Sequence, residues 1–119
     1  MIQTIIQEIN SIDPYDPLES QHIQETLEWI QSGASIFRIQ KPDIPPKHLV
    51  SYFVLVDILK QELLLVDHKM AQLWLPAGGH VEPNEHPRDT VTRECQEELD
   101  IQAVFFARGA IISHFYTHF

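Results

Sequence analysis

The stretch GHVEPNEHPRDTVTRECQEELDI, residues 79–101, decides the fold of this chain. Its second half predicts a helix over residues 86–99. In such a helix Glu94, Glu97 and Glu98 stand at positions i, i+3 and i+4, so their side chains converge on an arc of about 100°. Three like charges this close destabilise a helix unless a positive charge lies among them. The spacing therefore predicts a cation site.

The apolar stripe of the same predicted helix consists of Val91, Cys95 and Leu99. Glu98 falls almost in line with this stripe, whereas a helix that needed only solubility would carry its acids on the opposite face. We therefore expect a partly enclosed pocket of carboxylate oxygens, which suits a hard divalent cation such as Mg²⁺. Because Cys95 lies on the stripe, we expect it in the core and not as a nucleophile.

The spacing resembles the Nudix box, G-x5-E-x7-R-E-U-x-E-E-x-G-U, in which U is a bulky aliphatic residue. The box marks hydrolases that split a diphosphate linked to a nucleoside or another group. Cys95 replaces the first aliphatic residue, a mild change because a free cysteine behaves as a small hydrophobe. Asp100 replaces the second glycine, which would end the helix in the left-handed conformation. The matching residues are Gly79, Glu85, Arg93, Glu94, Glu97, Glu98 and Ile101.

The resemblance implies a metal site with a defined set of ligands. Glu94, Glu97 and Glu98 are the implied ligands, joined by the backbone carbonyl of Gly78. Mg²⁺ is the implied ion, with Mn²⁺ as an alternative. Such ions offset the charge that develops on the phosphates and lower the pKa of the attacking water.

The resemblance also implies catalytic and supporting residues. Glu94, Arg93 and Glu97 are the catalytic candidates, and Glu94 is the candidate that orients or deprotonates the water. Arg93 is expected to pair with Glu85 and so to hold the metal ligands in place. An ordinary surface ion pair, the alternative for these two residues, would contribute little. His80 is expected near the substrate.

Composition limits the class of protein. The chain has 119 residues and 44% hydrophobic content, which suits a single folded domain. A net charge of −9 argues against binding to nucleic-acid backbones. One cysteine permits no internal disulfide, and neither a secretory signal nor a membrane-spanning run is present in the sequence. We expect a cytoplasmic protein with no nucleic-acid or membrane partner.

The N-terminal third of the chain predicts two helices. Isoleucines 2, 5, 6 and 9 recur at helical spacing and predict a short amphipathic helix that ends near residues 13–14. Asp16 is the expected N-cap of the second helix, with Pro17 in its first turn, Glu19 completing a capping box and Gly33 as the stop. Both helices are expected to be packing elements; a substrate lid or a dimer surface is the alternative. The expected apolar face of the second helix is Ile23, Leu27 and Ile30.

The remainder of the chain predicts short strands and a proline-rich linker over residues 41–46. The run 49–59 is expected to be a buried strand, and residues 73–75 are expected to lead into a glycine-bearing loop. The predicted strands are residues 34–40, 49–59, 62–67, 73–75, 102–108 and 110–115.

Together these elements predict an α+β fold, an α/β/α sandwich with a Nudix-like mixed sheet and the loop and helix of the box. We expect residues 1–45 to form a helical extension with a linker and residues 46–119 to form the Nudix domain.

Eighteen residues follow Ile101, and no acidic residue follows Asp100. We therefore expect the C-terminal part of the Nudix fold to be missing, or to be covered by a partner chain such as a second copy in a homodimer. His114 and His118 have the spacing of a metal-binding pair on a helix, but their surroundings predict a strand, so zinc there is disfavoured.

The favoured function is a Mg²⁺-dependent hydrolase that cleaves the diphosphate bond of a nucleoside diphosphate linked to another moiety. The alternative is a truncated, non-catalytic binding module or dimerising fragment of the same fold. The sequence does not fix the substrate.

Overall fold

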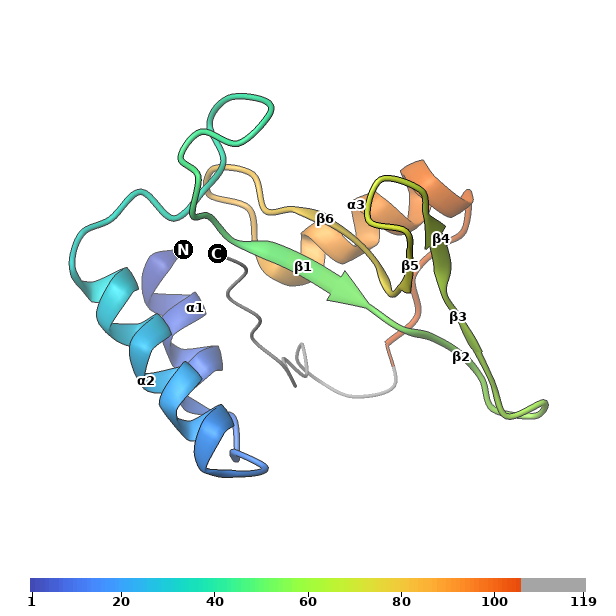
Figure 1. The fold of residues 1–119 in the computed structure, drawn as a ribbon, viewed down its shortest axis with the longest axis horizontal. Coiled ribbons are helices and arrows are strands. Elements are labelled where there is room, and N and C mark those ends of the chain that lie inside the picture. Colours follow the sequence, from blue (N-terminus) through green and yellow to red (C-terminus); the bar gives the residue numbers. More distant parts are fainter. Residues whose placement is uncertain (106–119) are drawn as a thin grey trace.

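Two helices lie side by side at the start of the chain in the computed structural model, which describes residues 1–105 (Figure 1). Helix α1 spans Ile2–Asn10 and helix α2 spans Pro17–Gln31, and the two pack against each other. α1 ends earlier than the sequence predicted. The Ser11 hydroxyl at its C-cap donates a hydrogen bond to the Glu8 carbonyl at 2.6 Å and so satisfies one of the last carbonyls of the helix.

The predicted N-cap of α2 is confirmed. The Asp16 carboxylate accepts a hydrogen bond from the Glu19 backbone N–H at 2.7 Å, and Pro17 occupies the first turn. The Glu19 carboxylate in turn accepts from the backbone N–H of Tyr15, one residue before the position that a standard capping box uses. Gly33, just beyond the helix, has a φ of 81°, a conformation that glycine adopts without steric cost.

The main hydrophobic core lies between α1, α2 and the segment that follows them. Ile36 is 1% exposed and packs into this core, but residues 34–40 do not form the predicted strand. A strand needs a series of backbone hydrogen bonds to a neighbouring strand, and these residues lack one. The Ile36 carbonyl accepts a single hydrogen bond from the Leu49 N–H, and the Gln40–Ile44 pair is an isolated bridge. The buried core residues are Ile5, Ile9, Leu27, Ile30 and Ile36.

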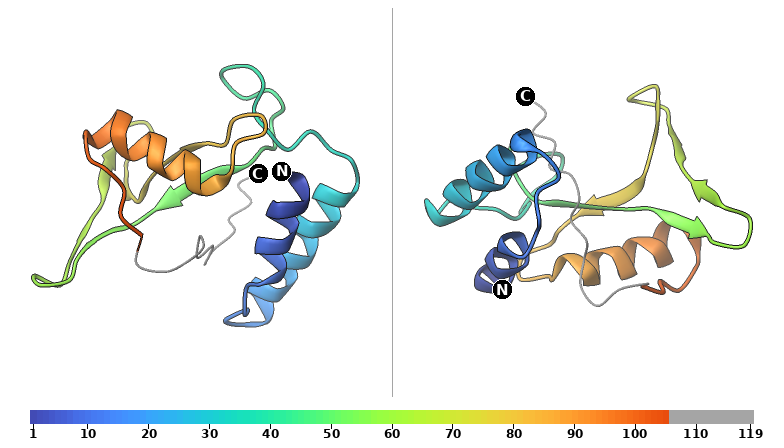
Figure 2. Two further views of the ribbon diagram at one scale, coloured as in Figure 1. Left: turned by 180° about the vertical axis from the view of Figure 1, so that it is seen from behind. Right: turned by 90° about the horizontal axis from the view of Figure 1, so that it is seen from below.

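Short strands in the described chain pair into three antiparallel ladders, β1 with β6, β2 with β3 and β4 with β5 (Figures 1 and 2). The strands are β1 Val50–Phe53, β2 Leu55–Asp57, β3 Glu62–Leu64, β4 Val66–His68, β5 Leu73–Leu75 and β6 Ala77–His80.

The expected mixed sheet is therefore not found in residues 1–105. Parallel pairing needs a crossover of a dozen or more residues, whereas short turns join β2 to β3 and β4 to β5. The predicted strand 49–59 breaks at Val54, where the chain leaves the β1–β6 ladder and enters the β2–β3 ladder. Residues 49–59 are also not buried, since each of them is exposed or half-buried. The coarser prediction of an α+β fold is confirmed.

Helix α3, Pro87–Leu99, is the helix predicted over residues 86–99, and it packs against β1 and β6 (Figure 2). Asp100 ends it with φ 52° and ψ 39°, the left-handed conformation expected for a residue in place of glycine. Residues 102–105 are not a strand, and the rest of the predicted strands 102–108 and 110–115 lies outside the described residues, as do His114 and His118. None of the helices within residues 1–105 is long and apolar enough to cross a membrane.

The glycine-bearing loop expected after β5 is a strand instead. Gly78 and Gly79 belong to β6, where they pair with Tyr52 and Ser51 of β1. A Cβ atom on Gly78 would lie 2.5 Å from the Ser51 carbonyl oxygen, so β1 and β6 approach too closely for a side chain there. The turn that leads to α3 therefore begins after His80, and the end of β6 faces the helix.

Replacement of Asp16 by alanine tests the cap of α2. The variant loses the side-chain acceptor for the Glu19 N–H, so its free energy of unfolding should fall by about 1 kcal/mol. Urea denaturation followed by circular dichroism measures this difference. Asp13→Ala, at an exposed carboxylate outside the helix, is the matched control and should change stability much less. Equal effects of both substitutions would contradict the cap.

Candidate functional site

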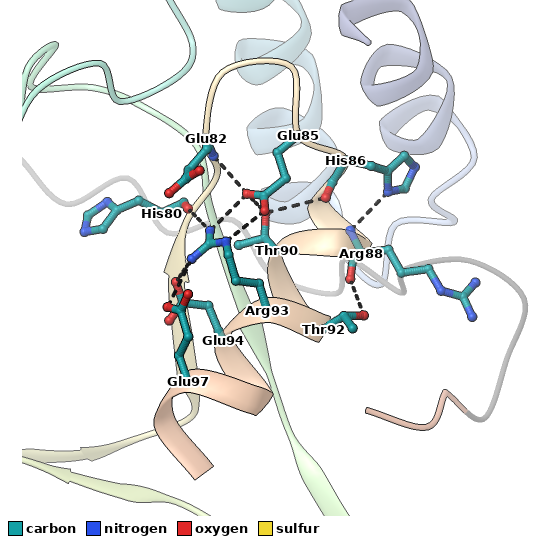
Figure 3. A network of polar contacts seen from close by, with 10 residues as sticks. All are labelled: His80, Glu82, Glu85, His86, Arg88, Thr90, Thr92, Arg93, Glu94 and Glu97. Carbon is teal, nitrogen blue, oxygen red and sulfur yellow. Dashed lines mark hydrogen bonds and ion pairs between the residues drawn. The ribbon is translucent and has the colours of Figure 1, made fainter. Parts of the chain in front are cut away.

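A bidentate ion pair between Arg93 of α3 and Glu85 of the preceding loop lies at the centre of the site (Figure 3). Arg93 Nε donates to Glu85 Oε1 at 2.9 Å and Nη2 donates to Glu85 Oε2 at 3.0 Å. These hydrogen bonds from Arg93 lower the pKa of the Glu85 carboxyl from 4.5 to about 2. The predicted pairing of these two residues is confirmed, and its fork geometry is the strong form of such a contact.

The same guanidinium also contacts the end of β6 and two acids of α3. Nη2 donates to the His80 carbonyl at 3.1 Å, and Nη1 donates to Glu94 Oε1 at 2.7 Å. Glu97 Oε2 is 3.5 Å from Nη1. Hydrogen bonding to Glu85 first, and then to Glu94, raises the pKa of Arg93 above its usual value. Arg93 thus supplies the positive charge that the clustered acids require.

Two supporting contacts were not predicted from the sequence. The Thr90 hydroxyl donates to Glu85 Oε2 at 2.7 Å, and the Glu82 backbone N–H donates to the same oxygen at 3.0 Å. Thr90 is completely buried, although its hydroxyl would suit the surface. Its position five residues after Glu85, in the first turn of α3, is the one feature of the sequence that could have indicated the contact.

Gly79 is needed because Glu94 occupies the space beside it. A Cβ atom on Gly79 would collide with the Glu94 carboxylate. Glu94 is only 8% exposed, so its charge is held between β6 and Arg93. The spacing of Gly79 and Glu94 in the sequence thus reflects a close packing of strand against helix.

Cys95 is 1% exposed on the apolar stripe of α3 together with Val91, and burial raises the pKa of its thiol. The expectation that Cys95 belongs to the core agrees with this placement, since a buried protonated thiol is a poor nucleophile.

The residues proposed as metal ligands differ in exposure. Glu94 is buried, whereas Glu97 and Glu98 are exposed on the next turn of α3. Glu94 and Glu97 share contact with one nitrogen of Arg93. Within residues 1–105, the oxygens of all three carboxylates do not gather within 4.8 Å of one another. Carboxylate oxygens are the ligands that a hard divalent ion prefers, so the chemistry of this donor set suits such an ion. In this arrangement Arg93 lies between Glu94 and Glu97.

His80 lies at the end of β6 and contacts His48, a residue outside the set predicted for the site. Its Nδ1 is 2.7 Å from Nε2 of His48, and both side chains are half-buried. Burial, followed by the nearby charges of Arg38 and His48, lowers the pKa of His80. Asp43 completes a group of three potential metal ligands with these two histidines. Residues 32 positions apart give no sequence pattern from which this group could have been predicted.

A further unpredicted contact joins helix α1 to the start of α3. His86, the N-cap of α3, has its Nε2 atom 3.0 Å from Glu8 Oε1 of α1, and its Nδ1 accepts from the Arg88 backbone N–H at 3.1 Å. The helical extension therefore contacts the start of the helix that carries the acids.

Comparison with known proteins shows the family of the chain. A family model described as the NUDIX domain matches residues 46–118, which include every residue of the Arg93 network. The chain therefore belongs to the NUDIX domain family, a family of hydrolases that act on pyrophosphate bonds. No curated protein and no solved structure matches the chain.

The ion pair predicts a specific dependence of stability on pH. Because folding lowers the pKa of Glu85 from 4.5 to about 2, the pair stabilises the fold above pH 4.5 and this stabilisation is lost as the pH falls towards 2. Glu85→Gln should therefore lose less of its free energy of unfolding over this interval than the wild type does. Urea unfolding at a series of pH values measures the two slopes.

The exposed carboxylate Glu25 of α2 offers the control for this experiment. Glu25→Gln should retain the wild-type slope. If Glu85→Gln also retained the wild-type slope, Glu85 would not be held as an ion pair in solution.

Proposed function

We propose that this chain is a Mg²⁺-dependent hydrolase that cleaves the diphosphate bond of a nucleoside diphosphate linked to another moiety. The observation that carries the proposal is the Arg93 network, which joins β6, the loop and α3 and brings Glu94 and Glu97 to one guanidinium. Membership of the NUDIX family supports the same class of reaction. Mn²⁺ is the alternative ion.

In this proposal Glu94, Glu97, Glu98 and the Gly78 carbonyl hold the ion. When bound, the ion offsets the charge on the diphosphate and lowers the pKa of the attacking water. Glu94 is the best placed carboxylate to orient that water, because burial between β6 and Arg93 restricts its side chain. Glu97 and Glu98 are exposed, so their oxygens are accessible to an ion from solvent.

Arg93 and Glu85 serve as positioning residues. Arg93 neutralises part of the acidic cluster and fixes Glu94, while Glu85 fixes Arg93 through two parallel bonds. His80 is proposed to bind the substrate, since it lies at the end of β6 and its carbonyl is part of the network. A small nucleoside diphosphate derivative is the proposed partner; the homodimer and the cytoplasmic location remain predictions.

Loss of a proposed ligand tests the activity. Glu97→Gln should abolish Mg²⁺-dependent product release from a panel of nucleoside diphosphate derivatives while leaving the circular dichroism spectrum unchanged, because the side chain is 58% exposed. Glu28→Gln, at an exposed position on α2, is the matched control and should retain wild-type turnover.

Full activity of Glu97→Gln would remove Glu97 from the metal site. Absence of turnover by the folded wild-type chain on every substrate would contradict the proposal and favour a non-catalytic binding module.

A conservative change at Arg93 tests the positioning role. Arg93→Lys keeps the charge but cannot form the bidentate contact with Glu85, so turnover should fall by about 10- to 100-fold. The apparent Mg²⁺ affinity, measured from the dependence of rate on Mg²⁺ concentration, should weaken at the same time. An unchanged Mg²⁺ dependence would show that Arg93 does not hold the ligands in place.

A further inference from the structure

A second group of potential ligands lies at the end of β6, formed by side chains outside the acidic cluster of α3. Asp43 and His48 belong to the connection between the helical pair and β1, and His80 is the last residue of β6. One ligand atom from each residue lies within 4.8 Å of the others. The antiparallel register that pairs Val50 with His80 brings these distant segments together.

The hydrogen bonds of His48 orient its ring as a ligand. Its Nδ1 is 2.6 Å from the Pro45 carbonyl oxygen. A carbonyl oxygen can only accept, so Nδ1 carries a proton and Nε2 of the neutral ring has a free lone pair. Metal-binding histidines in proteins are usually held in this way, with the second ring nitrogen donating to a backbone carbonyl.

The lone pair of His48 points at His80. Nε2 of His48 and Nδ1 of His80 are 2.7 Å apart, and the ring centroids are 4.9 Å apart. Without an ion, one hydrogen is shared between the two nitrogens. An ion bound by both rings would take the place of that hydrogen, and the neutral His80 ring would then carry its hydrogen on Nε2 instead of Nδ1.

We propose that Asp43, His48 and His80 bind a divalent transition-metal ion of the Zn²⁺ type, at a site separate from the carboxylates of α3. Two imidazoles and one carboxylate suit Zn²⁺, whereas Mg²⁺ prefers oxygen ligands alone. Three protein ligands leave a fourth coordination position open to water. Asp43 is exposed, so an ion can enter from solvent.

The site would stabilise the part of β6 that supports Arg93. The His80 carbonyl accepts a hydrogen bond from Arg93 Nη2, while the side chain of the same residue faces His48. An ion on His80 would therefore fix the 41–48 connection to the end of β6. Arg38 and Lys41 are close enough to act on His80 by charge and oppose cation binding, and Asp43 acts in the opposite direction.

Isothermal titration calorimetry with Zn²⁺ and visible spectroscopy with Co²⁺ test the proposal on the full chain. The wild type should bind one ion at this site and give Co²⁺ absorption bands typical of nitrogen ligation. His48→Ala and His80→Ala should lose this binding and the accompanying rise in melting temperature. His68→Ala, on exposed β4, is the matched control and should bind like the wild type.

Two further variants locate the ion. Glu97→Gln should retain the Zn²⁺ site, and so should a chain in which His114 and His118 are both alanine.

Long-range ¹H–¹⁵N spectra of the wild type should show that Zn²⁺ shifts the resonance of Nε2 of His48 and leaves Nδ1 protonated. His48→Gln replaces His48→Ala if the latter fails to fold.

Unchanged Zn²⁺ binding in the His48 and His80 variants would overturn the proposal. Loss of binding in Glu97→Gln would overturn it as well, by placing the ion on α3. Since binding is measured without turnover, failure here leaves the proposed hydrolase activity untouched, and inactivity of the chain leaves this site untouched.

Discussion

The arrangement of the site depends on the planar guanidinium of Arg93. Its nitrogens reach Glu85 in the loop, the His80 carbonyl at the end of β6 and the Glu94 carboxylate on α3. Because five donors are held in one plane, a single side chain fixes three segments relative to one another. It also compensates the charge of Glu94, whose burial without a partner would be costly.

The apolar core and the acidic cluster lie in different parts of the chain. The apolar core lies mainly in the helical extension, whereas the acids and their supporting bonds lie in the segment that matches the NUDIX family. The contact of Glu8 with His86 crosses the expected boundary at residue 45. The extension therefore contacts the start of α3, and the division into two domains remains a prediction.

The departures from the sequence-based expectations have a common physical cause. A strand is defined by its partner, so the predicted strand over 34–40 fails because Ile36 packs between helices instead of joining a ladder. The predicted single strand over 49–59 is split because its two halves pair with different strands. Gly78 and Gly79 resemble a loop in sequence, yet close approach of β1 makes them part of β6.

The sequence by itself determined the features that depend on local spacing. It indicated α3 and its left-handed end at Asp100, the Asp16 cap, the pair of Arg93 with Glu85 and the family of the chain, because helical periodicity and capping act over a few residues. Only the tertiary structure decided that Thr90 supports Glu85 from a buried position, and that His48 meets His80. Those contacts depend on how strands and helices pack in space, and no local periodicity encodes a pairing between residues 32 positions apart.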